Sequence, residues 1–146
     1  MGAIYRFLEM GIESFMVTSA VSGVLAQRLV RRICPECASA YEPPPEELDF
    51  YHSVGGHGMT FQRGTGCAAC AHTGFRGRIG VFEVLRMSDA IKRLLVRDAA
   101  PEALRQRAIT EGMSTLRSAG LAKIDEGLTT IAEVMRSVHV SEDVDA

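Results

Sequence analysis

The most constraining feature of this sequence is a pair of C-x-x-C motifs, which together contain every cysteine of the chain. Cys34 and Cys37 form the first motif, and Cys67 and Cys70 form the second, with 29 residues between the two motifs. A C-x-x-C turn lets both sulfurs reach one ion, and two such turns complete a closed tetrahedral site of the kind that holds structural zinc. We therefore predict that these four cysteines are metal ligands and that the cofactor is Zn²⁺.

Other uses of four cysteines fit less well. Neither motif lies in the strand-to-helix setting of a thioredoxin-like redox pair. Disulfide bonds need an oxidising compartment, and the N-terminus does not read as a signal peptide. An iron–sulfur cluster would use the same four residues, so the sequence leaves the choice between zinc and iron open.

The segment around the cysteines, from Cys34 to about Gly80, is rich in glycine and proline. Such a segment has little apolar core of its own, so we expect the metal to hold it together. Four thiolates around Zn²⁺ leave negative charge, which nearby cations can offset. Four arginines flank the cysteines and are candidates for this role: Arg31, Arg32, Arg76 and Arg78. Three histidines near the motifs, His52, His57 and His72, are expected at the surface or beside the ligands, and His72 is the best candidate for the second place.

Apolar spacing predicts helices over most of the remaining chain. A short helical pattern covers 4–10, and a longer helix is expected from Ile12 to about Arg31. Pro45 suits the start of a short helix, whereas Arg78–Leu85 alternates like a strand. Further helices are expected to begin at four positions: Ser88, Pro101, Ser114 and Thr130, the last with Glu133 as its capping-box partner.

The predicted fold class is therefore mainly α with minor β, a helical module with a tetracysteine zinc subdomain of irregular or β structure. We expect four segments along the chain. They are a helical segment over 1–33, the zinc-binding subdomain over 34–80, a strand plus a C-terminal helical subdomain over 81–140, and a disordered tail over 141–146.

Composition narrows the classes of function. The formal net charge is −2, without the basic excess that a nucleic-acid interface needs. No run approaches the roughly 20 apolar residues of a membrane-spanning helix. The sequence therefore predicts a cytoplasmic protein with no transmembrane segment and no nucleic-acid partner.

Longer motifs surround the cysteines. Residues 26–37 read AQRLVRRICPEC, and residues 66–85 read GCAACAHTGFRGRIGVFEVL. Later runs read TLRSAGLAK at 115–123 and GLTTIAEV at 127–134. Together these motifs resemble the C-terminal end of the type II secretion and type IV pilus assembly ATPases. Those proteins are hexameric P-loop motors that carry a tetracysteine metal subdomain late in the chain.

The resemblance implies a place and a function. The chain would be the C-terminal part of a larger α/β ATPase that powers protein export or pilus polymerisation, with 1–33 as the tail end of the ATPase core. Its partners would be neighbouring ATPase subunits and an inner-membrane platform protein, which would keep it cytoplasmic and peripheral at the inner membrane. The resemblance leaves open whether the parent protein serves a secretion system or a pilus system.

The chain departs from the family in one respect. A phosphate-binding loop needs G-x-x-x-x-G-K-[ST], but the only lysines, Lys92 and Lys123, follow Ile91 and Ala122. We therefore predict no catalytic residue and no nucleotide-binding residue here, and we expect ATP and Mg²⁺ only in the full-length parent. Whether Arg28 approaches nucleotide in an intact hexamer stays open.

One surface and two alternative functions stay open. The loop Thr73–Arg78 could contact a partner through Phe75 and its arginines, or Phe75 could pack internally. The main alternative function is a free-standing zinc-ribbon module that binds nucleic acid, which the acidic net charge disfavours. A cysteine redox protein is the second alternative.

Overall fold

The computed structural model describes residues 2–98 and 100–139. It divides into two compact units, each built from two stretches of the chain. The first unit is Met1–Ala26 with Glu83–Thr115, and the second is Gln27–Phe82 with Leu116–Ala146. The predicted disordered tail, 141–146, lies outside the described residues.

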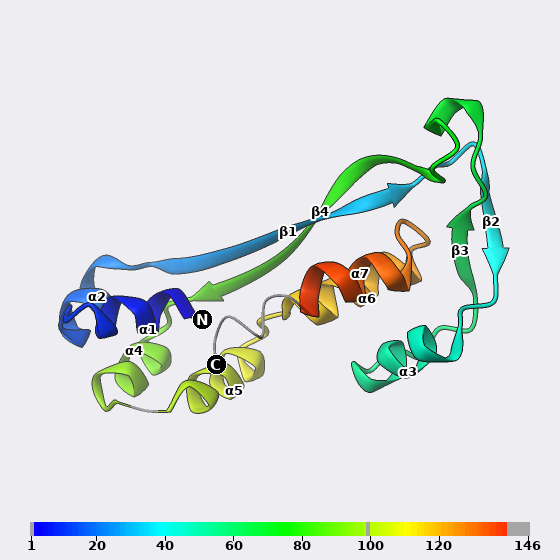
Figure 1. Ribbon diagram of the computed structural model, residues 1–146. Coiled ribbons are helices and arrows are strands. Elements are labelled where there is room, and N and C mark those ends of the chain that lie inside the picture. Colours follow the sequence, from blue (N-terminus) through cyan, green and yellow to red (C-terminus); the bar gives the residue numbers. More distant parts are fainter. Residues whose placement is uncertain (1, 99, 140–146) are drawn as a thin grey trace. The chain divides into compact units, whose positions relative to one another are not determined.

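The first unit is a small helical bundle. It contains α1 (Gly2–Glu9), α2 (Ser14–Ala20), α4 (Asp89–Val96) and α5 (Pro101–Thr110), shown in Figure 1. Ser88 caps α4 as predicted, because its hydroxyl accepts a hydrogen bond from the backbone N–H of Ile91 at 3.2 Å. One apolar cluster forms the core, with these buried members: Ile4, Val17, Leu85, Met87, Ile91, Leu95, Leu104 and Ala108.

The helix predicted from Ile12 to about Arg31 is wrong in its second half. The helix α2 ends at Ala20, and a strand, β1 (Gly23–Ile33), follows it and pairs with β4 (Phe75–Arg86). At Gly23 an added Cβ would lie 2.9 Å from the carbonyl oxygen of Leu85, so the two backbones approach more closely than a side chain allows. The predicted helical segment 1–33 therefore contains eleven residues of strand.

The second unit combines a small sheet with three α-helices. The strands β2 (Ala38–Tyr41) and β3 (Phe61–Gly64) are antiparallel, with Ala38 opposite Gly64 and Tyr41 opposite Phe61. The helices are α3 (Pro45–Ser53), α6 (Leu116–Asp125) and α7 (Ile131–His139), and a short 3-10 turn, η1, covers Ala68–Cys70. The second core contains Phe50, Tyr51, Phe61, Leu121, Ile124, Ile131, Val134 and Val138.

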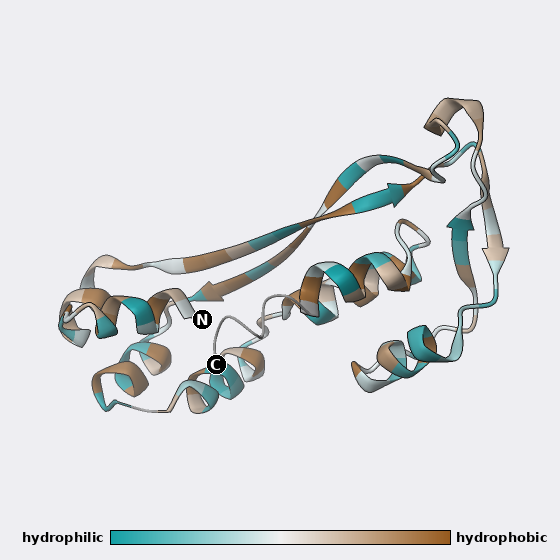
Figure 2. Cartoon of the chain, in the orientation of Figure 1, coloured by the Kyte–Doolittle hydropathy of each residue, from teal (hydrophilic) through white to brown (hydrophobic). Residues whose placement is uncertain are grey.

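Most predicted elements outside β1 are confirmed. Pro45 begins α3, Pro101 begins α5, and the strand predicted over Arg78–Leu85 is present and longer. The helix expected at Ser114 begins two residues later, at Leu116. Helices carry apolar and polar residues on different faces (Figure 2), and α7 buries Ile131, Val134 and Val138. The fold is mainly α with minor β, as predicted.

Among the helices that the structure describes, none combines the length and the apolarity that crossing a bilayer requires.

Candidate metal centre

The four cysteine sulfurs lie together in the second unit, all within 4.8 Å of one another. Each C-x-x-C is a tight turn. The backbone N–H of Cys37 donates to the carbonyl of Cys34 at 3.3 Å, and that of Cys70 donates to the carbonyl of Cys67 at 3.2 Å. The β2–β3 ladder explains why the two turns meet, because it sets the residue after Cys37 opposite Gly64.

The spacing of the sulfurs fits one metal ion. The Sγ–Sγ distance is 3.9 Å for Cys34 and Cys67, 3.9 Å for Cys37 and Cys70, and 3.8 Å for Cys67 and Cys70. A tetrahedral ion with metal–sulfur bonds of about 2.3 Å would separate its sulfurs by about 3.8 Å. A disulfide would bring two sulfurs to about 2.05 Å. The cluster can therefore hold a metal ion, and its thiols are not paired as disulfides.

Backbone amides point at one sulfur in particular. The N–H groups of Cys67 and Gly74 donate to Cys70 Sγ at 3.2 and 3.3 Å. These hydrogen bonds, that of Cys67 above all, lower the pKa of Cys70 to about 6. Burial instead raises the pKa of Cys37 to about 11. Because metal binding takes up the thiolate form, the site contains one sulfur that is already suited to it at neutral pH.

Two glycines, Gly64 and Gly74, allow the turn of the second cysteine motif to pack directly against β3. A Cβ added to Gly64 would lie 2.0 Å from the carbonyl oxygen of Gly74, and one added to Gly74 would lie 2.5 Å from that of Gly64. The backbones of β3 and of the loop after Cys70 thus touch directly. Thr73 fixes the same loop, because its hydroxyl donates to the carbonyl of Cys70 at 2.6 Å.

His72 takes the first of its two expected places, at the surface and not beside the ligands. Its side chain is exposed, and its contribution is made by its backbone, whose N–H donates to the carbonyl of Cys67 at 2.9 Å. The backbone of His72 is left-handed, with a φ of 60°, and it continues the left-handed turn at the end of η1.

The carboxylate of Glu133, which the sequence predicts as part of a capping box, is buried. Glu133 is 2% exposed, and its N–H donates to the hydroxyl of Thr130 at 3.3 Å, which is the first half of the predicted capping box. The second half is absent from the described contacts of its carboxylate. That carboxylate instead accepts from Arg31 Nη2 at 2.5 Å, from the Arg31 backbone N–H at 3.1 Å, and from Arg136 Nη2 at 3.1 and 3.2 Å.

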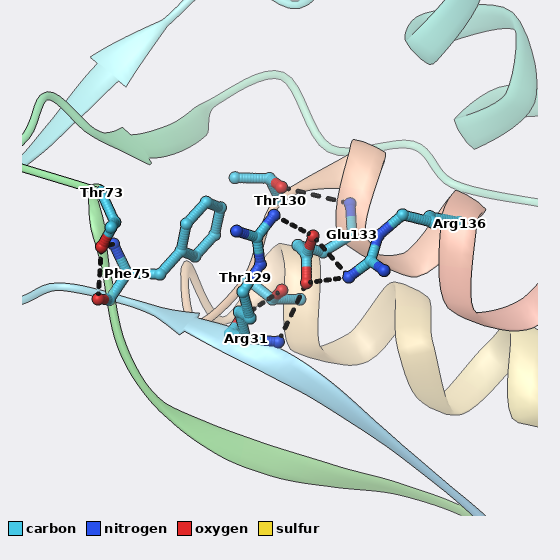
Figure 3. Close-up of polar contacts among 7 residues, drawn as sticks. All are labelled: Arg31, Thr73, Phe75, Thr129, Thr130, Glu133 and Arg136. Carbon is cyan, nitrogen blue, oxygen red and sulfur yellow. Dashed lines mark hydrogen bonds and ion pairs between the residues drawn. The ribbon is translucent and has the colours of Figure 1, made fainter.

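Arg31, one of the four arginines that flank the cysteines, has a partner of its own in this arrangement. Figure 3 shows its guanidinium between the carboxylate of Glu133 and the ring of Phe75, whose centroid is 4.1 Å away. Its charge is therefore engaged with Glu133, although its side chain, like those of Arg32, Arg76 and Arg78, is exposed. Burial alone would raise the pKa of Glu133, but the hydrogen bonds from Arg31 and Arg136 outweigh it and lower the pKa.

Comparison with known proteins identifies the family. A family profile described as "Type II/IV secretion system protein" matches residues 1–136. The chain is 40% identical over 135 residues to the type II secretion system ATPase E of Vibrio cholerae, covering 92% of this chain and 27% of that protein. It is 37% identical over 145 residues to the type IV pilus assembly ATPase PilB of Myxococcus xanthus, covering 92% of this chain and 24% of that protein. The PilB of Thermus thermophilus is 38% identical over 135 residues, covering 91% of this chain and 15% of that protein.

The chain thus spans about a quarter or less of the length of these relatives. The match nevertheless extends over nearly all of the chain and includes both cysteine motifs, the strand β4, the helix α6 and the first part of α7. On this evidence the chain belongs to the type II/IV secretion system protein family.

Proposed function

We propose that this chain is the C-terminal, non-catalytic portion of a hexameric ATPase that powers protein export or pilus polymerisation. Relatives named as secretion and pilus assembly ATPases match over 92% of the chain, yet the chain covers only about a quarter of their length. The 146 residues contain no G-x-x-x-x-G-K-[ST] motif. In this proposal ATP and Mg²⁺ bind elsewhere in the parent protein.

The observation that carries the proposal is the cluster of Cys34, Cys37, Cys67 and Cys70, with sulfur separations that suit one tetrahedral ion. We propose that this ion is Zn²⁺ and that it is structural, since four thiolates leave no open position for a substrate or water. Structural zinc contributes on the order of 10–16 kcal/mol of apparent binding free energy in small domains. That suffices to order the turns of a subdomain over 34–80.

The remaining elements of the proposal concern partners and place. The module would shape the subunit and transmit nucleotide-driven movement to neighbouring subunits and to an inner-membrane platform protein, from the cytoplasmic side. The stacking of Phe75 on Arg31 favours internal packing for that ring. Arg76 and Arg78, which are exposed at the start of β4, are then the better candidates for contacts with a partner.

The first experiment is elemental analysis of the purified chain, followed by its circular dichroism after chelation. We expect one zinc per chain, and loss of order around the cysteine turns with much of the helical signal retained. Iron in place of zinc, or no metal together with disulfides, would overturn the metal assignment.

The partner role needs the full-length motor. We expect Arg76→Ala with Arg78→Ala to reduce secretion or piliation while leaving hexamer formation and basal ATP hydrolysis intact. Arg97→Ala, at an exposed position in the other unit, is the matched control. If the double variant matches the control, the start of β4 is not a partner contact.

A further inference from the structure

The second unit contains an unbroken series of contacts from the buried carboxylate of Glu133 to the candidate metal ligands. Glu133 lies in the first turn of α7, where the helix dipole favours an anion. It holds both the backbone and the guanidinium of Arg31, at 3.1 and 2.5 Å. One carboxylate therefore fixes a residue that lies three positions before Cys34.

The strand around Arg31 is attached to the α6–α7 turn at two further points. The hydroxyl of Thr129 donates to the carbonyl of Arg31 at 2.8 Å, and the N–H of Ile33 donates to the carbonyl of Leu128 at 2.9 Å. Thr129 is 1% exposed and Ile33 is 3% exposed, so water does not compete for these bonds. The end of β1 that leads into Cys34 is thus held against the C-terminal helices.

The next step passes from Arg31 to the loop of the second cysteine motif. The Arg31 guanidinium covers the face of Phe75 at 4.1 Å, a distance suited to a cation–π contact. Phe75 directly follows Gly74, and the N–H of Phe75 donates to the Thr73 hydroxyl at 3.3 Å. Gly74 bonds to two ligands: its carbonyl accepts from the N–H of Cys34 at 2.9 Å, and its own N–H donates to Cys70 Sγ at 3.3 Å.

We propose that Glu133 is a positioning residue for the metal site: acting through Arg31 and Phe75, it sets the loop that orients Cys34 and Cys70. This inference rests on the metal site of the proposed function and adds a residue that contacts no sulfur. Partners that orient metal ligands typically change metal affinity by about 10- to 100-fold when removed. Because Glu133 acts through two intermediates, we expect the lower end, roughly tenfold.

The test compares Glu133→Gln with Arg136→Gln in the full chain, loaded with zinc. Arg136 bonds the same carboxylate from the same helix, but it does not touch Arg31 in the contacts described for it. It is therefore a control for loss of an ion pair on α7 without a break in the series. The readouts are the rate of zinc transfer to a colorimetric chelator and the absorption bands of Co²⁺ bound in place of zinc, which report on tetrahedral thiolate geometry.

We expect Glu133→Gln to release zinc about tenfold faster and to shift the Co²⁺ bands, while Arg136→Gln behaves like the unchanged protein. Phe75→Leu, which keeps apolar volume but removes the ring, should act in the same direction as Glu133→Gln. It also carries the test if Glu133→Gln does not fold.

Three results are decisive against parts of this reasoning. Unchanged release and bands in Glu133→Gln and Phe75→Leu would overturn the positioning role and leave the zinc site intact. Equal effects of Glu133→Gln and Arg136→Gln would reduce the role to general stability of α7 and overturn it as well. An unchanged protein that binds neither zinc nor Co²⁺ would instead overturn the proposed zinc site itself.

Discussion

Arg31→Met is the substitution that most directly tests how the second unit is held together. Methionine keeps an apolar stem over Phe75, and its backbone N–H can still donate to Glu133. What is lost is the guanidinium, which makes the 2.5 Å bond to a carboxylate that is only 3% exposed. Glu133 then keeps Arg136, whose side chain is 66% exposed.

The magnitude follows from these contacts. A hydrogen bond to a charged group contributes about 1.5–3 kcal/mol. Since the side chain of Arg31 is itself 48% exposed, solvent screening favours the lower figure, about 1.5 kcal/mol. A cation–π contact at an exposed site adds about 0.5 kcal/mol. We therefore expect the free energy of unfolding to fall by about 2 kcal/mol.

Urea unfolding of the zinc-loaded protein at pH 7 measures this loss. With a denaturant dependence of about 2 kcal/mol per molar urea, the midpoint should fall by about 1 M. Arg76→Met is the matched control, because Arg76 is an exposed arginine of the paired strand β4, and its midpoint should change little. If Arg31→Met and Arg76→Met unfold at the same urea concentration, the contacts of Arg31 do not stabilise the unit and the reasoning fails.

Three further predictions concern the same unit. Tyr51→Phe should lower the free energy of unfolding by about 1.5–3 kcal/mol in urea titrations, because the buried Tyr51 hydroxyl bonds both Asp125 and the N–H of Gly58. Tyr41→Phe, whose hydroxyl makes one 2.9 Å bond at a partly buried site, should cost less, and equal costs would contradict the burial argument. Gly64→Ala should weaken zinc retention in chelator competition, since the new methyl would meet the Gly74 backbone; unchanged retention would show that the contact is not needed. In metal-free protein, whose cysteine turns we expect to lose order, the alkylation rate of Cys70, followed by mass spectrometry, should have its midpoint near the ordinary thiol pKa of about 8.5; a midpoint near pH 6, the pKa that the two amides give Cys70 in the folded turn, would show that the turn persists without metal.

The meeting of the four cysteines was predictable from sequence because the geometry of each motif is local. Two residues between cysteines define each turn, and only the meeting of the two turns depends on the fold. That meeting is set by the β2–β3 ladder, whose register the sequence did not specify. The spacing of the motifs thus identified the residues that come together but not the elements that bring them together.

The strand β1 and the role of Glu133 were missed for a shared reason. Apolar residues of β1 such as Leu25 and Leu29, four positions apart, fit a helical period as well as an extended one, and pairing with the distant β4 decides between them. Thr130 and Glu133 have the spacing of a capping box, but Arg31 competes for the carboxylate from 102 residues away. In both cases a non-local partner outweighed a local pattern.

If Glu133 positions the metal ligands as proposed, metal binding and the packing of α7 stabilise each other. Closing the 29-residue stretch between Cys37 and Cys67 with a metal is worth about 3–4 kcal/mol in lost freedom of the unfolded chain. The two short paired strands, β2 and β3, are too small to fix the two turns without that closure. If Glu133 strengthens metal binding through Arg31, then metal binding must strengthen the attachment of α7 to β1 by the same free energy. A change imposed at the start of α7 would therefore alter the metal affinity of the cysteines, and loss of the metal would weaken the contacts of Arg31.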